Sequence, residues 1–556
     1  MLVACTLSCA AQEFTANITG TVVDPTKAPI QGATVSAKDV DRGTVRTATT
    51  NDTGAFNISN VPVGQYEVTV EAKGFQIAKQ PAMTLVMNQT ARLEFQLKVG
   101  GKETVVEVTT TAPLLQTDTS LLGSIVDSKT ATDLPLSTHN INQLTLISAA
   151  GVVTPNLFGF QAAQNSFGTG RPYVNGAREQ ENNFILDGMD NNQPDNNDVG
   201  YVPAPEAIQE FNLITGSAPA DFGNYLGGVV NVTIKSGTNE YHGSLYEYMR
   251  RGGLNANNWS NNLNNIKRPG LRYDAFGGTF GGPIVKNKLF FFADYYESLY
   301  SQPATVTQLR TISPAQRGGD FSALCTAGFT GGICNNPVQQ LFNPFSSANP
   351  ATRTPYSNNF ISPGTFSSAA SKIINSDFYR KLDEFANNIS QFRTNSFQGD
   401  LKIDFVPSSR DHVMGRWSQQ FITAPNSNSI QLLGDSDRTF PLKNFVLDET
   451  HTFSASLLND ARVGFAYFPV TEGFSNPTGV NLPATFGIAS VTDTFLPAIV
   501  FQGANQPGTI GNNDLVQSFH DTTLQFEDTA TWTHKKHVIH FGFQAYRYIM
   551  NDLYPG

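Results

Sequence analysis

The stretch PEAIQEFNLITGSAPADFGNYLGGVVNVTIKSG, residues 205–237, decides the fold of this chain. Pro205 suits the first turn of a short helix, and a strand, a loop, a glycine pair and a second strand follow it. Because glycine is used where backbones crowd, Gly227 and Gly228 predict that the second strand passes close to a surrounding barrel wall. Residues 112–236 mix helical and strand patterns in this way, whereas the chain on either side shows strand patterns.

A second helical pattern lies upstream of that stretch. Ile141, Leu144 and Ile147 repeat at three-residue spacing after Ser137 and Thr138. This spacing predicts a short helix capped by one of the two hydroxyl side chains.

Residues 12–98 predict a small all-β sandwich. Short strands are separated by turn signals about every 8 to 12 residues, and two of these turns lie at 52–54 and 62–64. Apolar and polar residues alternate in YEVTVEAK as in a half-buried strand. One face carries Tyr66, Val68, Val70 and Ala72, and the other carries Glu67, Thr69, Glu71 and Lys73.

Residues 237–556 show strands with the alternation of a membrane barrel. In FQGDLKIDF, residues 397–405, Leu401 and Ile403 are on the face expected to meet lipid, whereas Lys402 and Asp404 are on the face expected to meet a wet lumen. The same period fits a water-soluble sandwich, so alternation alone leaves both structures open. No apolar window of about 18 residues occurs, which excludes a membrane-spanning helix but not a barrel.

The middle segment, residues 112–236, resembles the plug domain of TonB-dependent outer-membrane transporters. Besides residues 205–237, the passages LPLSTHNINQLTLISAAGV (134–152) and VNGAREQENNFILDGMDNN (174–192) carry the resemblance. FGGTFGGPIVKNKLFFFADYYES (276–298) is similar to a hairpin typical of the Oar-like subgroup of these transporters. The resemblance implies a mainly β protein with an N-terminal β-sandwich, a small α+β plug and an incomplete antiparallel transmembrane β-barrel.

The sandwich resembles the carboxypeptidase regulatory-like family. That family has no catalytic residues and is grouped with carbohydrate-binding-like folds, so the resemblance implies either a spacer or a domain that contacts carbohydrate. The passages that carry it are ITGTVVD (18–24), GATV (32–35), NDTGAF (51–56), PVGQY (62–66) and the closing pair Gly74 and Phe75.

Residues 99–111 join the sandwich to the plug as a β-prone run with too few apolar residues for a core. An exposed strand of this kind can add to a partner's sheet edge, because its backbone N–H and C=O groups are unsatisfied. The run resembles a TonB box, which implies TonB, working with ExbB and ExbD, as a partner. An ordinary interdomain strand is the alternative. The candidate TonB-contact residues are Glu103, Thr104, Val105, Val106, Glu107, Val108 and Thr109.

The residues near the two ends of the chain lead to two further predictions. Residues 1–11 are interpreted as the remnant of a secretory signal, cleaved after Ala11. At roughly 25 to 30 residues per strand and connection, residues 237–556 supply about 11 to 13 strands, against about 22 in large plugged transporters. Because an open sheet edge cannot persist in lipid, we expect further barrel strands beyond this chain.

The sequence predicts neither an enzyme nor a bound cofactor, because no motif of nucleophilic, metal-dependent or nucleotide-dependent catalysis occurs. His534 and His537 can form a two-histidine metal pair, but we interpret them as part of a solvated hairpin. Cys325 and Cys334 predict a loop disulfide in an exported chain. An acidic, amide-rich loop supplies the candidate substrate-facing residues of the plug, Asp187, Asp190, Asp195 and Asp198.

The resemblance implies active uptake of a scarce, large solute of siderophore, glycan or peptide type. Long Asn/Ser/Pro/Gly-rich stretches, notably residues 300–395, are predicted to be extracellular loops. The alternative is an outer-membrane adhesin or surface-structure protein, which these long loops and the sandwich also suit. A soluble carbohydrate-binding protein is a third possibility, and the plug passages argue against it. The net charge of −10 leaves no basic surface for nucleic acid. We expect the barrel in outer-membrane lipid of a Gram-negative bacterium and the N-terminal domain in the periplasm.

Overall fold

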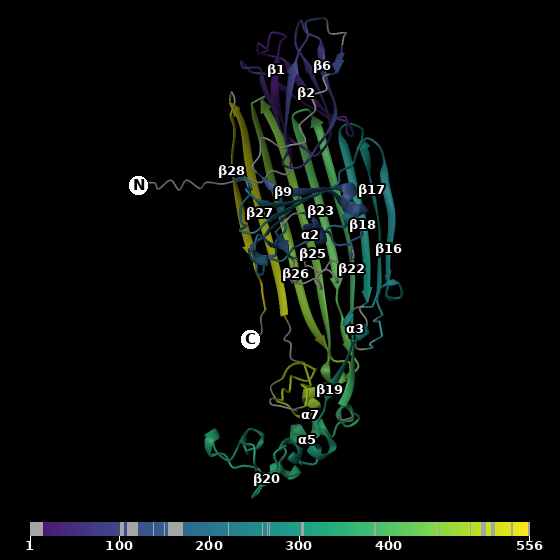
Figure 1. Cartoon of the computed structure of the whole chain (residues 1–556), viewed down its shortest axis with the longest axis vertical. Coiled ribbons are helices and arrows are strands. Elements are labelled where there is room, and N and C mark those ends of the chain that lie inside the picture. The colour runs from purple at the N-terminus through teal and green to yellow at the C-terminus, as the bar shows by residue number, and fades with distance from the viewer. Residues whose placement is uncertain are drawn as a thin grey trace, which may run out of the picture.

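The structure is a computed structural model with three parts along its long axis. A sandwich lies at one end, a tall curved sheet with the plug against it in the middle, and a cluster of loops at the other end (Figure 1). The signal remnant and the candidates Glu103, Thr104, Val108 and Thr109 lie outside the described residues. The described residues are 15–100, 105–107, 121–136, 138–148, 151–153, 171–220, 222–257, 259–263, 265, 267–268, 270–301, 305–382, 385–454, 456–489, 491–501, 507–512, 517–534 and 537–553.

The N-terminal domain is a sandwich of two sheets. Its strands are β1 (Ala16–Val23), β2 (Thr34–Asp39), β3 (Val45–Thr49), β4 (Ala55–Val61), β5 (Gly64–Glu71), β6 (Ile77–Leu85), β7 (Thr90–Gln96) and, from the linker, β8 (Val105–Glu107). One sheet has the order β4-β1-β7 and the other β3-β2-β5-β6-β8. Tyr66, Val68 and Val70 on β5 are buried in the core between the sheets, as the alternation predicted.

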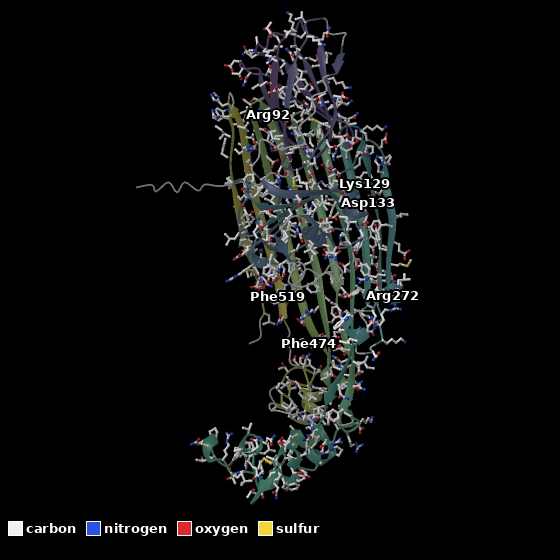
Figure 2. All side chains as sticks on the ribbon, in the orientation of Figure 1. Arg92, Lys129, Asp133, Arg272, Phe474 and Phe519 are labelled. Atoms are coloured by element: carbon white, nitrogen blue, oxygen red, sulfur yellow. A yellow bond between two sulfur atoms is a disulfide. The ribbon has the colours of Figure 1, made fainter. Side chains whose placement is uncertain are left out.

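The plug is a small α+β unit around a five-stranded sheet. Its elements include β9 (Leu122–Asp127), α1 (Ser128–Asp133), β12 (Asn183–Leu186), β13 (Met189–Asp190), η4 (Pro205–Ala207), β14 (Ile208–Gly216) and β15 (Val229–Ile234). The sheet order is β13-β12-β15-β14-β9, with β12 and β15 parallel and the other pairs antiparallel. Lys129 and Asp133 form an exposed ion pair along α1 (Figure 2). Pro205 lies in the first turn of η4, as predicted.

The upstream helical pattern forms η1 (Ile141–Gln143) and α2 (Leu144–Ser148). The N-cap is Asn140, whose side chain accepts a hydrogen bond from the backbone N–H of Asn142 at 2.9 Å. The predicted hydroxyl cap is therefore wrong, because the helix begins two residues later than the hydroxyls require.

Crowding at the glycine pair comes from the plug itself. A Cβ on Gly227 would lie 2.5 Å from Oδ1 of Asn182, and one on Gly228 would lie 3.0 Å from the side chain of Val174. The prediction that these glycines approach the barrel wall is therefore wrong, because the atoms nearest to them belong to the plug. The physical reason for small residues, backbone crowding, still holds.

The barrel part is an 11-stranded antiparallel sheet within the described residues. Its main path runs through β16 (His242–Arg251), β17 (Arg272–Val285), β18 (Leu289–Ser301), β22 (Phe385–Ser408), β23 (Asp411–Thr423), β25 (Asp435–Ser454), β26 (Leu457–Ser475), β27 (Gln517–His534) and β28 (His537–Ile549). The short strands β19 (Thr305–Arg310) and β24 (Asn426–Asn428) add to β22. The predicted fold class, with an open antiparallel sheet in place of a closed barrel, is confirmed.

The two faces of this sheet differ in burial as the alternation predicted. On β22, Leu401 is 48% exposed and Ile403 39%, whereas Lys402 and Asp404 are each 4% exposed. The apolar side chains therefore form the outer, lipid-facing surface. The polar side chains point inward and are covered by the plug and the sandwich, so their environment is drier than the wet lumen that the sequence suggested.

The region predicted as loop, residues 300–395, is partly strand. β19 pairs with the first residues of β22, from Thr305 opposite Ser390 to Arg310 opposite Phe385. Polar residues such as Asn387 and Asn388 lie in this part of the hairpin beside Phe385 and Ile389, which are 51% and 48% exposed. No helix in the described ranges is long and apolar enough to cross a membrane.

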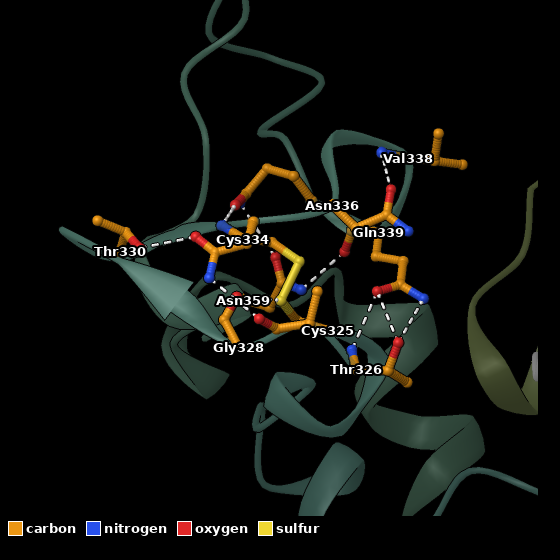
Figure 3. The surroundings of a disulfide bond; sticks show 12 residues. Cys325, Thr326, Gly328, Thr330, Cys334, Asn336, Val338, Gln339 and Asn359 are labelled. Carbon is orange, nitrogen blue, oxygen red and sulfur yellow. Dashed lines mark hydrogen bonds between the residues drawn. A yellow bond between two sulfur atoms is a disulfide. The ribbon is translucent and has the colours of Figure 1, made fainter.

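The loop cluster at the far end contains the disulfide between Cys325 and Cys334, where the sequence predicted one (Figure 3). The backbone N–H of Cys334 donates to the side chain of Gln340 at 2.7 Å. Asn359 accepts from the N–H of Leu341 and donates to the carbonyl of Gln339, both at 2.8 Å. The cross-linked segment is thereby joined to the turn that contains Asn359.

Candidate functional site

The plug contacts the inner face of the sheet through the turn between β12 and β13. Asp187 and Gly188 form this turn, with φ angles of 46° and 76°. Lys402 donates to Oδ1 of Asp187 at 3.0 Å, and Nε of Arg416 lies 2.8 Å from Oδ2 as an ion pair. All three side chains are buried. Lys402 also donates to the carbonyl of Ile234 at 2.9 Å, so one lysine joins two plug segments to the sheet.

A second buried charge cluster lies beside this turn on the sheet. Arg462 on β26 is 1% exposed and donates to Asp448, Asp460 and Glu527 at 2.7, 2.8 and 3.0 Å. The same guanidinium donates to the carbonyl of Gly188 at 3.3 Å. The guanidinium of Arg462 thus offsets part of the negative charge of the three carboxylates, and it also binds the backbone of the plug.

The plug residues after this turn contact β27. The backbone N–H of Asp190 donates to the side chain of Gln525 at 2.8 Å, and Gln193 bonds to Asp521. Burial raises the pKa of Asp190 to about 6, although hydrogen bonds from Asn192 oppose the shift. The carboxyl group of Asp190 is therefore placed to titrate close to neutral pH.

The four predicted substrate-facing aspartates occupy different environments. Asp187 and Asp190 are buried at the contacts above, and Asp198 is buried and forms an ion pair with Arg171 at 3.1 Å. Asp195 is exposed. The turn and loop bring these residues onto one side of the plug, but only Asp195 faces solvent in this structure. A role toward substrate stays a prediction for all four.

Tyr201 makes a further contact between the plug and the sheet. Its hydroxyl donates to Asp400 at 2.7 Å, and Asp400 also bonds to Ser418 on the neighbouring strand. Gln398 donates to the carbonyl of Val202 at 3.0 Å. The alternation in residues 397–405 puts Gln398 and Asp400 on the same face as Lys402 and Asp404, but it gave no signal for their partners in the plug.

The sandwich contacts the plug through Glu210 on β14. Its carboxylate accepts the backbone N–H of Met87 at 2.9 and 3.0 Å. Nearby, the N–H of Asn239 donates to the carbonyl of Asp41 at 2.9 Å, and Nε of Arg42 donates to the carbonyl of Gly237 at 3.2 Å. These bonds hold the sandwich at the end of the sheet where the plug chain enters the barrel strands.

Glu210 predicts a pH dependence of stability. Burial raises the pKa of its carboxyl from 4.5 to about 7, with Asp127 adding to the shift and the Met87 N–H opposing it. The folded state therefore binds the proton more tightly than the unfolded state. The stability contributed by this group is present below about pH 4.5 and is lost as the pH rises to about 7.

We expect Glu210→Gln to stabilise the protein at pH 8 by up to about 3 kcal/mol and to change little at pH 4.5. Thermal unfolding in detergent at both pH values measures this difference. The control is Glu94→Gln, since Glu94 is exposed on β7 and should give the wild-type pH profile. A destabilised Glu210→Gln at pH 8 would show that the bond from Met87 outweighs the cost of burying the charge.

The candidate TonB-contact segment is described at Val105–Glu107. These residues form β8, which pairs in parallel with β6, with Val105, Val106 and Glu107 opposite Ile77, Ala78 and Lys79. The sequence predicted that this segment forms a strand able to pair with the edge of a sheet. Which edge it meets follows only from the fold.

Two family models match the chain. The outer membrane beta barrel domain matches residues 233–556, and the carboxypeptidase regulatory-like domain matches residues 17–98. The TonB-dependent transporter Oar of Myxococcus xanthus is 27% identical over 318 residues, which are 53% of this chain and 28% of that protein. The ferrienterobactin receptor of Escherichia coli (strain K12) is 34% identical over 76 residues, 14% of this chain and 10% of that protein.

Two solved structures match the chain at low identity. The outer membrane transporter YddB from Escherichia coli matches 76% of this chain and 47% of its own, with 12% identity and a TM-score of 0.47. The siderophore receptor PirA from Acinetobacter baumannii matches 79% of this chain and 49% of its own, with 13% identity and a TM-score of 0.41.

Because the barrel model covers more than half of the chain, the chain belongs to the outer membrane beta-barrel family, and it is similar to a TonB-dependent transporter of that kind. The predicted class is confirmed, and the protein lies in the outer membrane. Its relatives are transporters and receptors, not enzymes. The chain spans less than a third of the length of Oar and about a tenth of the ferrienterobactin receptor.

Proposed function

We propose that this chain is the plug-bearing part of a transporter that takes up a scarce, large solute across the outer membrane with energy delivered through TonB, ExbB and ExbD. The observation that carries the proposal is the plug itself. It lies against the inner face of the sheet and is held there by buried ion pairs at Asp187 together with small apolar clusters, such as Met189 with Met414 and Val446. Such contacts are specific, and they can be exchanged for water when the plug moves.

One relative and the sandwich support particular solute classes. One relative is a ferrienterobactin receptor, which supports a siderophore among the siderophore, glycan and peptide types. The sandwich belongs to a fold group that includes carbohydrate-binding domains, which supports a glycan. Both substrates are too large for simple pores. The exposed Asp195 and the loop cluster around Cys325 are the parts proposed to meet the solute first.

The TonB-contact segment 103–109 gives the test of this function. If the segment adds as a strand to TonB, main-chain hydrogen bonds carry the affinity. Val106→Pro removes one backbone donor and fixes φ, so we expect it to abolish energised uptake while surface binding of the solute stays close to wild type. Uptake and cell-surface binding of a labelled solute are measured in cells that express the full reading frame.

Val106→Ala is the matched control, because it shortens the side chain and leaves the backbone donor in place. We expect it to retain most of the uptake. Loss of surface binding in Val106→Pro would indicate misfolding, and full uptake by Val106→Pro would place the TonB contact outside residues 103–109.

A further inference from the structure

The linker strand β8 occupies the outer edge of the sandwich. Among the described strands, β6 pairs with β5 on one side and with β8 on the other, and β8 is the last strand of this sheet. Within the described residues, three residue pairs join β6 to β8, beginning at Ile77 and Val105. The strand that the sequence offers to TonB is thus already added to a sheet edge of its own chain.

The chain between β7 and β8 is bonded to the start of β6. The N–H of Gln76 donates to the carbonyl of Lys98 at 2.9 Å, and the N–H of Gly100 donates to the carbonyl of Gly74 at 3.2 Å. Phe75 and Val99 form an isolated antiparallel bridge. These bonds bring residues 98–100 beside the beginning of β6, which shortens the path to the docked position of β8.

The sandwich that carries this edge is itself bonded to the rest of the molecule. Met87 bonds to Glu210 of the plug, and Asp41 and Arg42 bond to the chain at Gly237 and Asn239. The edge of β6 is therefore fixed relative to the barrel. A strand docked on it cannot reach a distant partner without leaving the edge.

We propose that the outer edge of β6 is the resting site of the strand Val105–Glu107, and that the sandwich and TonB compete for this strand. The inference rests on the proposed function, in which this strand binds TonB. In the docked strand the backbone groups that face β6 are already bonded, so TonB could pair only with the groups on the other side of β8, whereas a released strand offers either side. The apparent affinity for TonB is the intrinsic affinity multiplied by the fraction of molecules in which β8 is free.

The first test weakens the resting site without changing the candidate TonB-contact residues. Lys79 is the register partner of Glu107 and forms an ion pair with Glu67 at 2.8 Å. Lys79→Glu places like charges in one cross-strand pair, which destabilises the pairing. We expect the purified full-length protein to bind the periplasmic domain of TonB about two- to fivefold more tightly, with faster amide hydrogen exchange at residues 105–107.

Lys79→Gln is the matched control, because it removes the ion pair with Glu67 without adding a negative charge. It should bind TonB with an affinity between those of the wild type and Lys79→Glu. Unchanged affinity together with unchanged hydrogen exchange in Lys79→Glu would overturn the proposal.

The second test fixes the strand in place. The double variant Lys79→Cys with Glu107→Cys joins two register partners when oxidised, because paired strands lie about 4.8 Å apart and a disulfide spans Cα separations of about 4.4 to 6.8 Å. We expect the oxidised protein to lose TonB binding by at least about tenfold and to regain it on reduction. Each single cysteine variant, and the wild type treated with the same reductant, control for the changed side chains and for the native disulfide at Cys325.

The outcomes separate the two proposals. Equal TonB binding by the oxidised and reduced double variant would overturn the resting site and leave the TonB contact intact. If TonB binds neither the wild-type protein nor a free peptide of residues 101–111, both the proposed TonB contact and the proposed competition for the strand are overturned.

Discussion

Asp187→Asn is expected to destabilise the plug–sheet contact by about 3 to 5 kcal/mol, because it leaves two buried cations without their anion. Lys402 and Arg416 are almost fully buried, and Asp187 is the carboxylate that faces both. An asparagine keeps the shape of the side chain but not its charge. The free energy of unfolding, or the rate at which the plug is cleaved by protease in the detergent-solubilised protein, measures the change.

Asp195→Asn is the control for this variant. Asp195 belongs to the same acidic loop but is exposed, so the same substitution should change stability by less than about 0.5 kcal/mol. Equal melting temperatures for the two variants would contradict the assignment of Asp187 as the charge that holds the plug. In the transporter, a weakened contact should also admit small solutes that the wild type excludes.

Arg462→Met is expected to have the largest effect on stability, because the cation it removes is shared by three buried carboxylates. Removing one partner of a buried ion pair typically costs about 3 to 5 kcal/mol. Here Asp448, Asp460 and Glu527 would face one another without a cation. We expect the variant to fail to assemble in the outer membrane or to unfold at a much lower temperature in detergent.

Two further variants make this result specific. Arg462→Lys keeps the charge but cannot reach all three carboxylates, so its stability should lie between those of the wild type and Arg462→Met. Arg272→Met removes an arginine that is largely exposed and pairs with Asp274 at the end of β17 (Figure 2). Exposed pairs contribute little, so this control should assemble normally. A wild-type level of assembled Arg462→Met would show that the cluster is not needed.

The sequence predicted local features of the fold better than the contacts between its parts. Alternation placed Leu401 outward and Lys402 inward because a strand turns successive side chains to opposite faces. It could not show that Lys402 meets Asp187, which is 215 positions away in the chain. Such a contact depends on how the plug is seated against the sheet, and no local pattern encodes that.

Short polar segments misled the sequence interpretation in two places. Ser137, Thr138 and Asn140 are all good N-cap residues, so the sequence did not show which of them caps the helix. In the structure the N-cap is Asn140, and the helix begins at Ile141. β22 begins at Phe385, inside the predicted loop, because its first residues include asparagine and serine, which are typical of loops. In both cases the sequence pattern indicated the kind of residue present but not the position at which the helix or strand begins.

The length of β22 sets how far the protein reaches from the cell. Its 24 residues, at about 3.3 Å each, extend about 80 Å, and even at a tilt of about 45° they rise about 55 Å against a hydrocarbon layer of about 30 Å. The sandwich and the loop cluster lie at opposite ends of the sheet (Figure 1), so with the sandwich in the periplasm, as we expect, this surplus stands on the outside. The tip that carries the disulfide is thus raised clear of the lipid surface, where it can meet molecules that do not penetrate the outer leaflet.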